Sequence, residues 1–450
     1  MSTHTSPSPR AQIMKLALPV MGGSIIESLY NLTDAFFLGK LGTAEISAPS
    51  IAFSINFFFI IFGTGLSGAI TTLIAQSKGK NDAAKMNHYA NQGASMLALT
   101  AVLAAAAGVL LAGPVLRLLD TPPEVYGFAL DYLRIILTGL PFMFVYFALQ
   151  SIYTALGDTV TPLVVHLAAV IANVALDPLL IFGLGPFPAM GVPGAALATV
   201  LSQGLGALLS LAVLLRAKNG VRLTGSAMKP QRKAWMLLLK IGLPSGLGQA
   251  VSAFGFTIMQ GLVNSMGTAV IAAFGVGSRL FNMFDIPAFG ISNATTALVG
   301  RSLGAKDLSG ARRYVRSALV LVVVLEVPLM VAAMAAGGGL VKFFVNDPEV
   351  IRLGGIMFRV ITPSLLLFSL YMALTGAFQG AGDTKIIMVL SVARLWLIRL
   401  PVAYALAWLT DLGPYVIWIA MFASNLLTAI AGWLYFRKGP WRKALDPDTL

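Results

Sequence analysis

Gly42-Thr43-Ala44 recurs 225 residues later as Gly267-Thr268-Ala269, and Gly157-Asp158-Thr159 recurs at the same offset as Gly382-Asp383-Thr384. Single residues keep the same register without a gap, as Pro19 does with Pro244. In a very apolar chain, a duplication of this length is typical of transporters built from two related halves. The duplication also helps to distinguish structural residues from functional ones. Residues shared by both halves are expected to be scaffold, and polar residues present in one half only are candidates for function.

The composition indicates an integral membrane protein. Of the 450 residues 57% are hydrophobic and only 11% are charged, and the mean hydropathy is +0.83. So little charge cannot cover the surface of a soluble domain. Apolar runs of about 20 residues, the length that crosses a bilayer as a helix, recur along the chain. Their apolar residues are continuous and not alternating, which argues against membrane strands. Twelve helical spans are predicted, at residues 13–38, 47–75, 90–115, 125–155, 160–183, 191–216, 238–263, 270–299, 315–340, 353–380, 385–410 and 413–436.

The net charge of +13 would suggest nucleic acid as a partner, but its distribution argues against that. Most of the basic residues lie in the segments on one side of the predicted spans, which the positive-inside rule makes the cytoplasmic side. Both termini are therefore expected in the cytoplasm. Membrane lipids with anionic headgroups are the expected partner of this charge, and no nucleic acid is expected.

The predicted fold is all-α and membrane-embedded, with 12 transmembrane helices in two six-helix lobes. Because each half holds an even number of spans, the halves are parallel repeats, related by an axis along the membrane normal. Rocking of the lobes around a central cleft would give alternating access. The expected parts are a disordered cytoplasmic tail (1–12), an N-lobe (13–216), a linker that acts as a cytoplasmic tether (217–237), a C-lobe (238–437) and a cytoplasmic tail (438–450).

Signatures of enzymes are missing or misleading. The chain has no cysteine, and hence no thiolate metal site or thiol catalysis. It contains neither a His-Glu-x-x-His zinc motif nor a Walker A motif. Residues 300–304 spell Gly-x-Ser-x-Gly, but their repeat partner at 75–79 breaks that pattern. The shared serine and glycine fit a helix end better than a nucleophile elbow. No enzymatic activity and no cofactor are expected.

Few acidic residues are predicted deep within the spans. An ionised carboxylate in hydrocarbon is costly, so such a residue usually faces a cavity and has a function. Asp285 and Glu326 each precede a proline by two residues, where an acid can instead serve backbone groups freed by a kink. The acids predicted in spans are Glu27, Asp34, Asp177, Asp285 and Glu326.

The repeat singles out the first half. Helical spacing puts Glu27, Asn31 and Asp34 on one face of the first span, and Asn173 and Asp177 on one face of the fifth. In the second half their equivalents are largely apolar: Ser252, Phe256, Met259, Ile398 and Val402, in the same order.

Such a cluster is suited to binding a coupling ion. Burial and the repulsion between two carboxylates both favour the protonated form, and carboxylates that meet titrate as a pair. With oxygens from Asn173 and Thr199, the cluster could instead hold a bare Na⁺, and the residues do not choose between the ions. His166 lies eleven residues before Asp177 and can share its face. A packing or hydrogen-bonding role is expected for it.

With these residues in view, the chain resembles the multidrug and toxic compound extrusion (MATE) family, and most closely its DinF branch. The resemblance implies that Asp34, Asn173, Asp177 and Thr199 are cation-linked. It also implies that Glu27, Asn31, Asp34 and Tyr132 line an N-lobe pocket and that the first span bends at Pro19. The motifs that carry it are Lys15-Leu16-Ala17-Leu18-Pro19, Asn31-Leu32-Thr33-Asp34, Leu41-Gly42-Thr43-Ala44, Gly157-Asp158-Thr159 and Asn173-x-x-x-Asp177-Pro178.

The expected function is secondary antiport, with export of cationic or amphipathic drugs and other toxic organic compounds in exchange for H⁺ or Na⁺. The expected setting is a monomer in a bacterial or archaeal cytoplasmic membrane. A flippase for lipids or lipid-linked oligosaccharides is the alternative, and Arg394 and Arg399 in the eleventh span are suggestive of it. These arginines can instead pair with Asp285 or snorkel to the surface. A channel or a non-transporting receptor would not need coupled acids.

Overall fold

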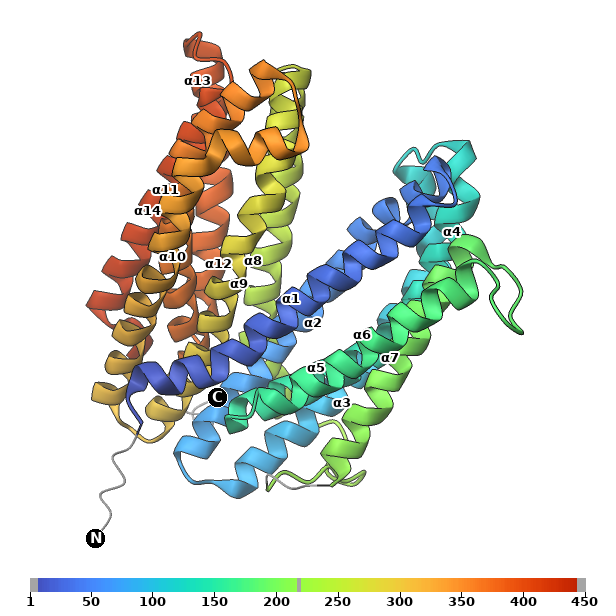
Figure 1. Cartoon of the computed structure of the whole chain (residues 1–450). Helices are drawn as coiled ribbons and strands as arrows, with labels where there is room; N and C mark the ends of the chain where they lie inside the picture. The colour runs from blue at the N-terminus through green and yellow to red at the C-terminus, as the bar shows by residue number, and fades with distance from the viewer. Residues whose placement is uncertain (1–6, 217–219, 443–450) are drawn as a thin grey trace. The chain divides into compact units, whose positions relative to one another are not determined.

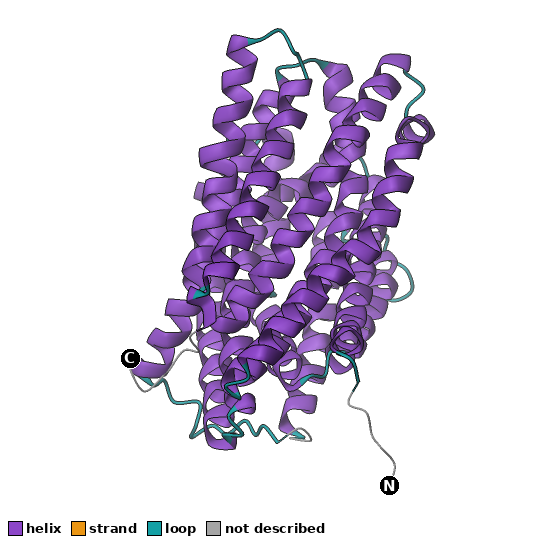
Figure 2. Ribbon diagram, turned by 90° about the vertical axis from the view of Figure 1, so that its left-hand side faces the viewer, coloured by secondary structure: helices purple, strands orange, loops and turns teal. Residues whose placement is uncertain are grey.

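The computed structural model describes residues 7–216 and 220–442, and within them every regular element is a helix (Figure 2). Predictions for residues 1–6, 217–219 and 443–450 lie outside the described residues. The helices of the first half are α1 (Pro9–Gly39), α2 (Thr43–Gly79), α3 (Ala83–Leu118), α4 (Pro123–Thr138), α5 (Leu140–Leu156), α6 (Val160–Ile181) and α7 (Gly191–Leu215). Those of the second half are α8 (Arg232–Asn264), α9 (Thr268–Gly304), α10 (Leu308–Phe344), α11 (Pro348–Ala381), α12 (Thr384–Val392), the π-helix η1 (Ala393–Arg399), α13 (Leu400–Leu409), α14 (Tyr415–Lys438) and the 3-10 turn η2 (Pro440–Arg442).

The predicted membrane fold is confirmed. Among the described residues, eleven helical segments are long and apolar enough to cross a membrane, and α4 with α5 makes a twelfth span that bends by 43°. The bend falls at Gly139, and Pro141 follows it without a backbone N–H to donate. The repeat equivalents are Ser364 and Leu366, and there α11 continues as one helix.

The first helix starts earlier than predicted. Residues 9–12, expected in the disordered tail, are helical, because Pro9 at the first helical position has no N–H to leave unpaired. The Ser8 hydroxyl also accepts a hydrogen bond from the Ala11 amide at 3.3 Å, which caps the first turn.

The chain forms two compact units whose borders lie inside helices. Of the described residues, 22–216 with 220–243 form the first-half unit, and 7–21 with 244–442 form the second-half unit. Both borders adjoin prolines that the repeat aligns, Pro19 in α1 and Pro244 in α8. The predicted lobes, 13–216 and 238–437, follow the ends of spans, whereas these units follow packing.

In the second-half unit, α11 packs against α9, α10 and α14 (Figure 1). Gly376 lets the backbones of α11 and α9 approach closely, because a Cβ at this position would lie 2.4 Å from the Ser292 carbonyl oxygen. The start of α1 belongs to this core: Ile13, Leu16 and Ala17 are buried among residues of α9, α10 and α11.

In the first-half unit, α2 packs against α3, α4 and α5, and α7 packs against α4, α5 and α6. The described part of the linker does not hang free as a tether, because side-chain amides of α3 hold its backbone. Asn91 accepts from the Thr224 amide at 2.9 Å and donates to the Arg222 carbonyl at 2.8 Å. Asn87 and Gln92 make similar pairs of bonds with linker residues from Gly220 to Gln231.

The eleventh span is α12, η1 and α13 in succession. Pro401, two residues after η1, has no N–H for a bond to residue 397, and a wider π turn accommodates this loss. In a π-helix residues five apart stack on one face, so Arg394 and Arg399 lie together.

Candidate functional site

The first-half unit brings the predicted acidic cluster together. On α6, Asn173 donates a hydrogen bond to Asp177 Oδ1 at 3.3 Å, and both side chains are buried. Asp34 on α1 interacts electrostatically with Asp177. The charge of Asp34 therefore acts on Asp177, and such an effect is stronger in the low dielectric of the protein interior than in water.

Two tyrosines and a threonine enclose these acids. Tyr132 of α4 is buried and interacts electrostatically with both Asp34 and Asp177. The Tyr30 hydroxyl lies 2.9 Å from Thr199 Oγ1, which joins α1 to the buried face of α7. Four helices thus contribute to one site, and every predicted cation-linked residue belongs to it.

The cluster contains polar atoms that lack partners. Among the described residues nothing donates to Oδ1 of Asp34, Oδ1 of Asn173 or Oδ2 of Asp177, although all three oxygens are buried. An unpaired buried acceptor costs about 1–3 kcal/mol, and more when it is charged. A proton on either carboxylate, or a cation bound among the oxygens, would remove that cost.

The remaining predicted site residues lie differently. Glu27 of α1 contacts His166 of α6, with Oε2 and Nε2 3.1 Å apart. His166 therefore has a polar partner at hydrogen-bond distance, in line with the packing or hydrogen-bonding role expected of it. Asn31 is exposed, and no hydrogen bond links it to the cluster within the described residues. Pro19 lies in the interior of α1, next to the border between the two compact units.

Tyr30 is a site residue that the sequence reasoning missed, although a signal for it was present. Its repeat equivalent is Gly255, so it is polar in one half only. It also lies three residues after Glu27 and four before Asp34, which is the helical spacing of one face.

The second-half unit contains a different polar cluster, centred on the two arginines of η1. Arg399 is 1% exposed and donates to Ser424 Oγ at 2.9 Å and Asn425 Oδ1 at 2.8 Å. Arg394 donates to the same Asn425 oxygen at 3.4 Å, and its guanidinium lies 4.7 Å from the Phe368 ring centroid. Neither arginine snorkels to a surface. Arg394 interacts electrostatically with Asp285, but no ion pair within 4.0 Å joins them.

Glu326 is the other unusual residue of this unit. It is 0% exposed, and neither carboxylate oxygen has a hydrogen-bond partner among the described residues. Asp285 interacts with it electrostatically. Burial of a carboxyl group without such a partner is costly when the group is charged.

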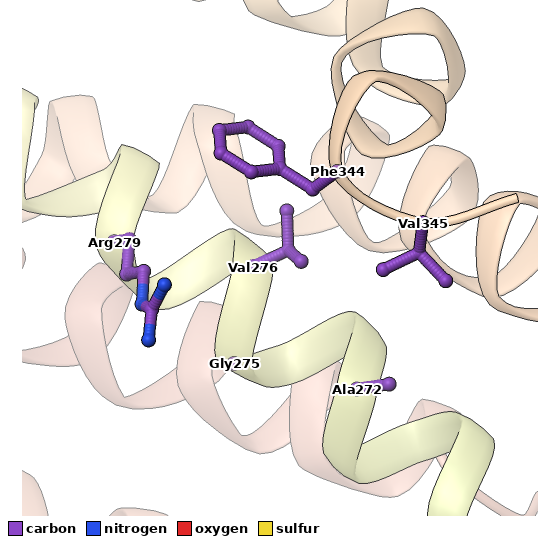
Figure 3. A pocket seen from close by; sticks show the side chains of 6 residues that line it. All are labelled: Ala272, Gly275, Val276, Arg279, Phe344 and Val345. Carbon is purple, nitrogen blue, oxygen red and sulfur yellow. The ribbon is translucent and has the colours of Figure 1, made fainter. Parts of the chain in front are cut away.

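A surface pocket lies elsewhere, in the second-half unit. Figure 3 shows it between α9 and the end of α10, where Arg279 is the one charged residue of an otherwise apolar lining made by Ala272, Gly275, Val276, Phe344 and Val345. None of the predicted site residues contributes to it. Within the described residues, no three His, Cys, Asp or Glu side chains group as metal ligands do.

Comparison with known proteins places the duplication in a family. The sequence profile described as MatE matches residues 19–179 and again 244–405, once in each half. The chain is 29% identical over 433 residues to the probable multidrug resistance protein YpnP of Bacillus subtilis, covering 96% of this chain and 95% of that protein. It is 26% identical to the probable multidrug resistance protein NorM of Thermotoga maritima, covering 97% and 94%.

Solved structures support the fold. One is described as the outward-facing conformation of a multidrug resistance MATE family transporter of the MOP superfamily, and it matches with a TM-score of 0.89 at 23% identity over 96% of each chain. A MOP superfamily transporter from Pyrococcus furiosus matches with the same values. Agreement of backbones over nearly the whole length, at so low an identity, is evidence about architecture.

Proposed function

The chain belongs to the MatE family, and on that premise we propose that it is a secondary antiporter that exports cationic or amphipathic organic compounds in exchange for H⁺ or Na⁺. Its substrates are small organic molecules, drugs among them. It works as a monomer in a bacterial or archaeal cytoplasmic membrane with both termini in the cytoplasm, as the basic segments favour.

One observation carries this proposal: the three buried oxygens of Asp34, Asn173 and Asp177 that lack donors. A structural polar cluster would be expected to satisfy its own hydrogen bonds. A site that exchanges a small cation has to release it, and it leaves oxygens without protein donors for that purpose.

The coupled cation acts through charge. With both acids ionised, the cluster attracts a cationic substrate. Protonation or Na⁺ binding neutralises Asp34 and Asp177, lowers that attraction and changes the hydrogen bonding of α1. Binding of one cation therefore weakens binding of the other, and the two effects are equal by linkage.

Helix α1 is suited to transmit this change. Its part up to Met21 packs in the second-half unit, and its part from Gly22 onward carries Tyr30 and Asp34 in the first-half unit. Pro19 removes the backbone hydrogen bond to the Lys15 carbonyl just before this border, which weakens that turn of the helix. Bending there would move Asp34 relative to Asp177 and displace the substrate.

The flippase alternative has lost its main support. Arg394 and Arg399 are buried and bonded within their own unit, and are not arrayed for a phosphate headgroup. No other observation favours that alternative.

The test is efflux of ethidium, a permanently charged cation, from proteoliposomes with an imposed proton gradient and then a sodium gradient. Wild type is compared with Asp34→Asn and Asp177→Asn, with Asp411→Asn in the loop before α14 as a control. Export driven by either gradient and lost in the two cluster variants supports the proposal. Normal gradient-driven export by Asp34→Asn would overturn the role given to the cluster, and no export by wild type would overturn the function.

A further inference from the structure

A second titratable group lies in the first-half unit, apart from the acidic pair. It consists of Glu27 on α1 and His166 on α6, whose Oε2 and Nε2 atoms are 3.1 Å apart. The Tyr146 ring of α5 lies beside the imidazole, with 5.5 Å between centroids. Along α1 the step from Glu27 to Asp34 is about 10 Å, and along α6 the step from His166 to Asp177 is about 16 Å. The two groups are therefore separate sites.

Comparison with the second half indicates that the ionisable groups of this pair are not needed to hold the helices together. At the equivalent positions the second half has Ser252, Tyr371 and Ser391, and the contacts recur there: Ser252 Oγ donates to the Ser391 carbonyl at 3.4 Å, and the Tyr371 hydroxyl lies 3.1 Å from Ser391 Oγ. Neutral side chains are thus sufficient to hold these three helices together. The first half keeps the tyrosine but replaces both serines with groups that can be charged.

The pair is also reachable. The Glu27 side chain is 51% exposed, whereas that of His166 is 20% exposed. A ligand can therefore approach the carboxylate without displacing the packing around the imidazole. The adjacent Tyr146 offers an aromatic surface of the kind that attracts organic cations.

Few other charges act on the pair. Tyr30 and Tyr146 interact electrostatically with Glu27, and both are neutral phenols near neutral pH. Asp34 and Asp177 lie farther along the same two helices. Helix α7, which packs against α6, has no ionisable side chain. Glu27 and His166 are therefore each other's nearest titratable partner among the groups named here.

We propose that His166 is a proton site that competes with the cationic group of a substrate for the Glu27 carboxylate. With neutral His166, Glu27 is a free anion that binds an organic cation against Tyr146. When His166 takes up a proton, the imidazolium pairs with Glu27, cancels its charge and releases the cation. One carboxylate is thus neutralised either by a proton held on histidine or by the substrate, which is a one-for-one exchange.

Histidine is the residue suited to this exchange because its charge ordinarily changes between about pH 5 and 8. By linkage, a bound cation expels the proton from His166 as strongly as the proton expels the cation. The inference rests on the proposed export function and adds a second coupling position to it.

The experiment measures ethidium binding to the purified full chain in lipid nanodiscs at about pH 5.5 and about pH 8, on either side of the histidine range. In wild type, the affinity at the lower pH is expected to be weaker by at least about fivefold, the lower end of typical coupling. In His166→Gln this part of the pH effect disappears, so that the affinity falls less in acid than it does in wild type. In His166→Lys, which is always charged, affinity is low at both pH values.

Glu27→Gln is expected to bind weakly at both pH values, and adding His166→Gln to it should change nothing more, because both act through one interaction. His88→Gln is the matched control, since His88 also lies beside a tyrosine ring, at 5.3 Å, but has no carboxylate partner among the described residues. An unchanged pH effect in His166→Gln, or additive effects in the double variant, would overturn the inference.

The two proposals fail separately. If ethidium efflux in wild type is gradient-driven and depends on Asp34, yet His166→Gln retains the full pH effect on binding, only the role of His166 is wrong. If wild type exports nothing under either gradient, the transport function is wrong, whatever the binding data show.

Discussion

The Tyr30 hydroxyl lies 2.9 Å from Thr199 Oγ1, and this contact joins α1 to α7 beside Asp34. The repeat equivalents are Gly255 and Ser424, and a glycine cannot form such a bond. The contact therefore belongs to the first half alone, like the acids that it adjoins. It holds the carboxylate-bearing part of α1 against the buried face of α7.

Removing this contact should alter ion coupling more than folding. Tyr30→Phe keeps the ring and loses the hydrogen bond. The loss costs about 1 kcal/mol, which corresponds to a roughly fivefold change in an equilibrium constant. We expect the proton or sodium concentration for half-maximal efflux to shift by that factor. Tyr153→Phe is the control, because it loses a bond to the Val213 carbonyl in the same unit, away from the acids. Equal shifts in both variants would contradict the prediction.

Asn425 is expected to be the most sensitive polar residue of the second-half unit. Its Oδ1 accepts from both Arg394 and Arg399, so Asn425→Leu leaves donors of two buried cations unpaired. We expect a loss of about 2–3 kcal/mol in stability, measured as a lower melting temperature in detergent. Asn293→Leu should have little effect, since Asn293 is exposed and bonds only within its helix. Equal melting temperatures for the two variants would show that the arginines find other acceptors.

Gly376 sets the distance between α9 and α11. In Gly376→Ala the new Cβ would lie 2.4 Å from the Ser292 carbonyl oxygen, so the helices have to separate. Overpacking of this kind costs about 1–3 kcal/mol. Gly127→Ala in α4 meets nothing within 4 Å and should be neutral or stabilising by up to about 1 kcal/mol. Thermal unfolding of both variants tests this, and a neutral Gly376→Ala would contradict it.

The hydrogen bonds between the linker and α3 lead to a prediction for hydrogen exchange. Asn87 Oδ1 accepts from the Arg222 amide at 2.7 Å, and Asn91 Oδ1 accepts from the Thr224 amide at 2.9 Å. Asn87→Ala should speed exchange at Arg222, and Asn91→Ala at Thr224, each by roughly fivefold for a bond of about 1 kcal/mol. Because each variant is expected to affect mainly its own amide, each serves as the control for the other. Fast exchange of both amides in wild type would mean that the linker is not bound to α3.

The cap of α10 should respond to acid. Asp307 accepts from the Gly310 amide at 2.8 Å and from the Ser309 hydroxyl at 2.7 Å, and the bond from the Gly310 amide, followed by that from Ser309, lowers the pKa of Asp307. Because the folded pKa is the lower one, the cap stabilises the helix above the unfolded pKa and is lost as the pH falls through the folded value. Asp307→Ala should therefore speed amide exchange in the first turn of α10 at neutral pH and have little effect in strong acid. An equal effect at both pH values would contradict this.

Much of the fold could be predicted from local pattern. Long apolar runs define the spans, and the helix boundaries agree to within a few residues for most of them. The starts of α3, α8 and α10 are exceptions, since these helices begin six or seven residues before the predicted spans. Helix α1 begins four residues early, because Pro9 and Ser8 start the helix in a segment that composition alone makes polar. The docking of the linker was also missed, since its partners Asn87 and Asn91 lie more than 130 residues away.

The candidate site was predicted unevenly. Comparison of the halves found Asp34, Asn173 and Asp177, because those positions are polar in one copy only. It missed Tyr30, and it predicted a packing or hydrogen-bonding role for His166 without naming Glu27 as the partner. Which carboxylate a histidine meets depends on how α1 and α6 are turned toward each other, and neither helix encodes that alone.

The sequence by itself determined that this is a duplicated membrane protein and that the cluster of Asp34, Asn173 and Asp177 belongs to one half. These follow from hydrophobicity, length and repetition, which are properties of the chain, and its motifs match the MatE family. Only the tertiary structure decided that Glu27 pairs with His166 and that Arg394 and Arg399 converge on Asn425. Such pairs depend on contacts a few ångströms long between distant segments, and a rotation of one helix by a single residue would exchange every partner.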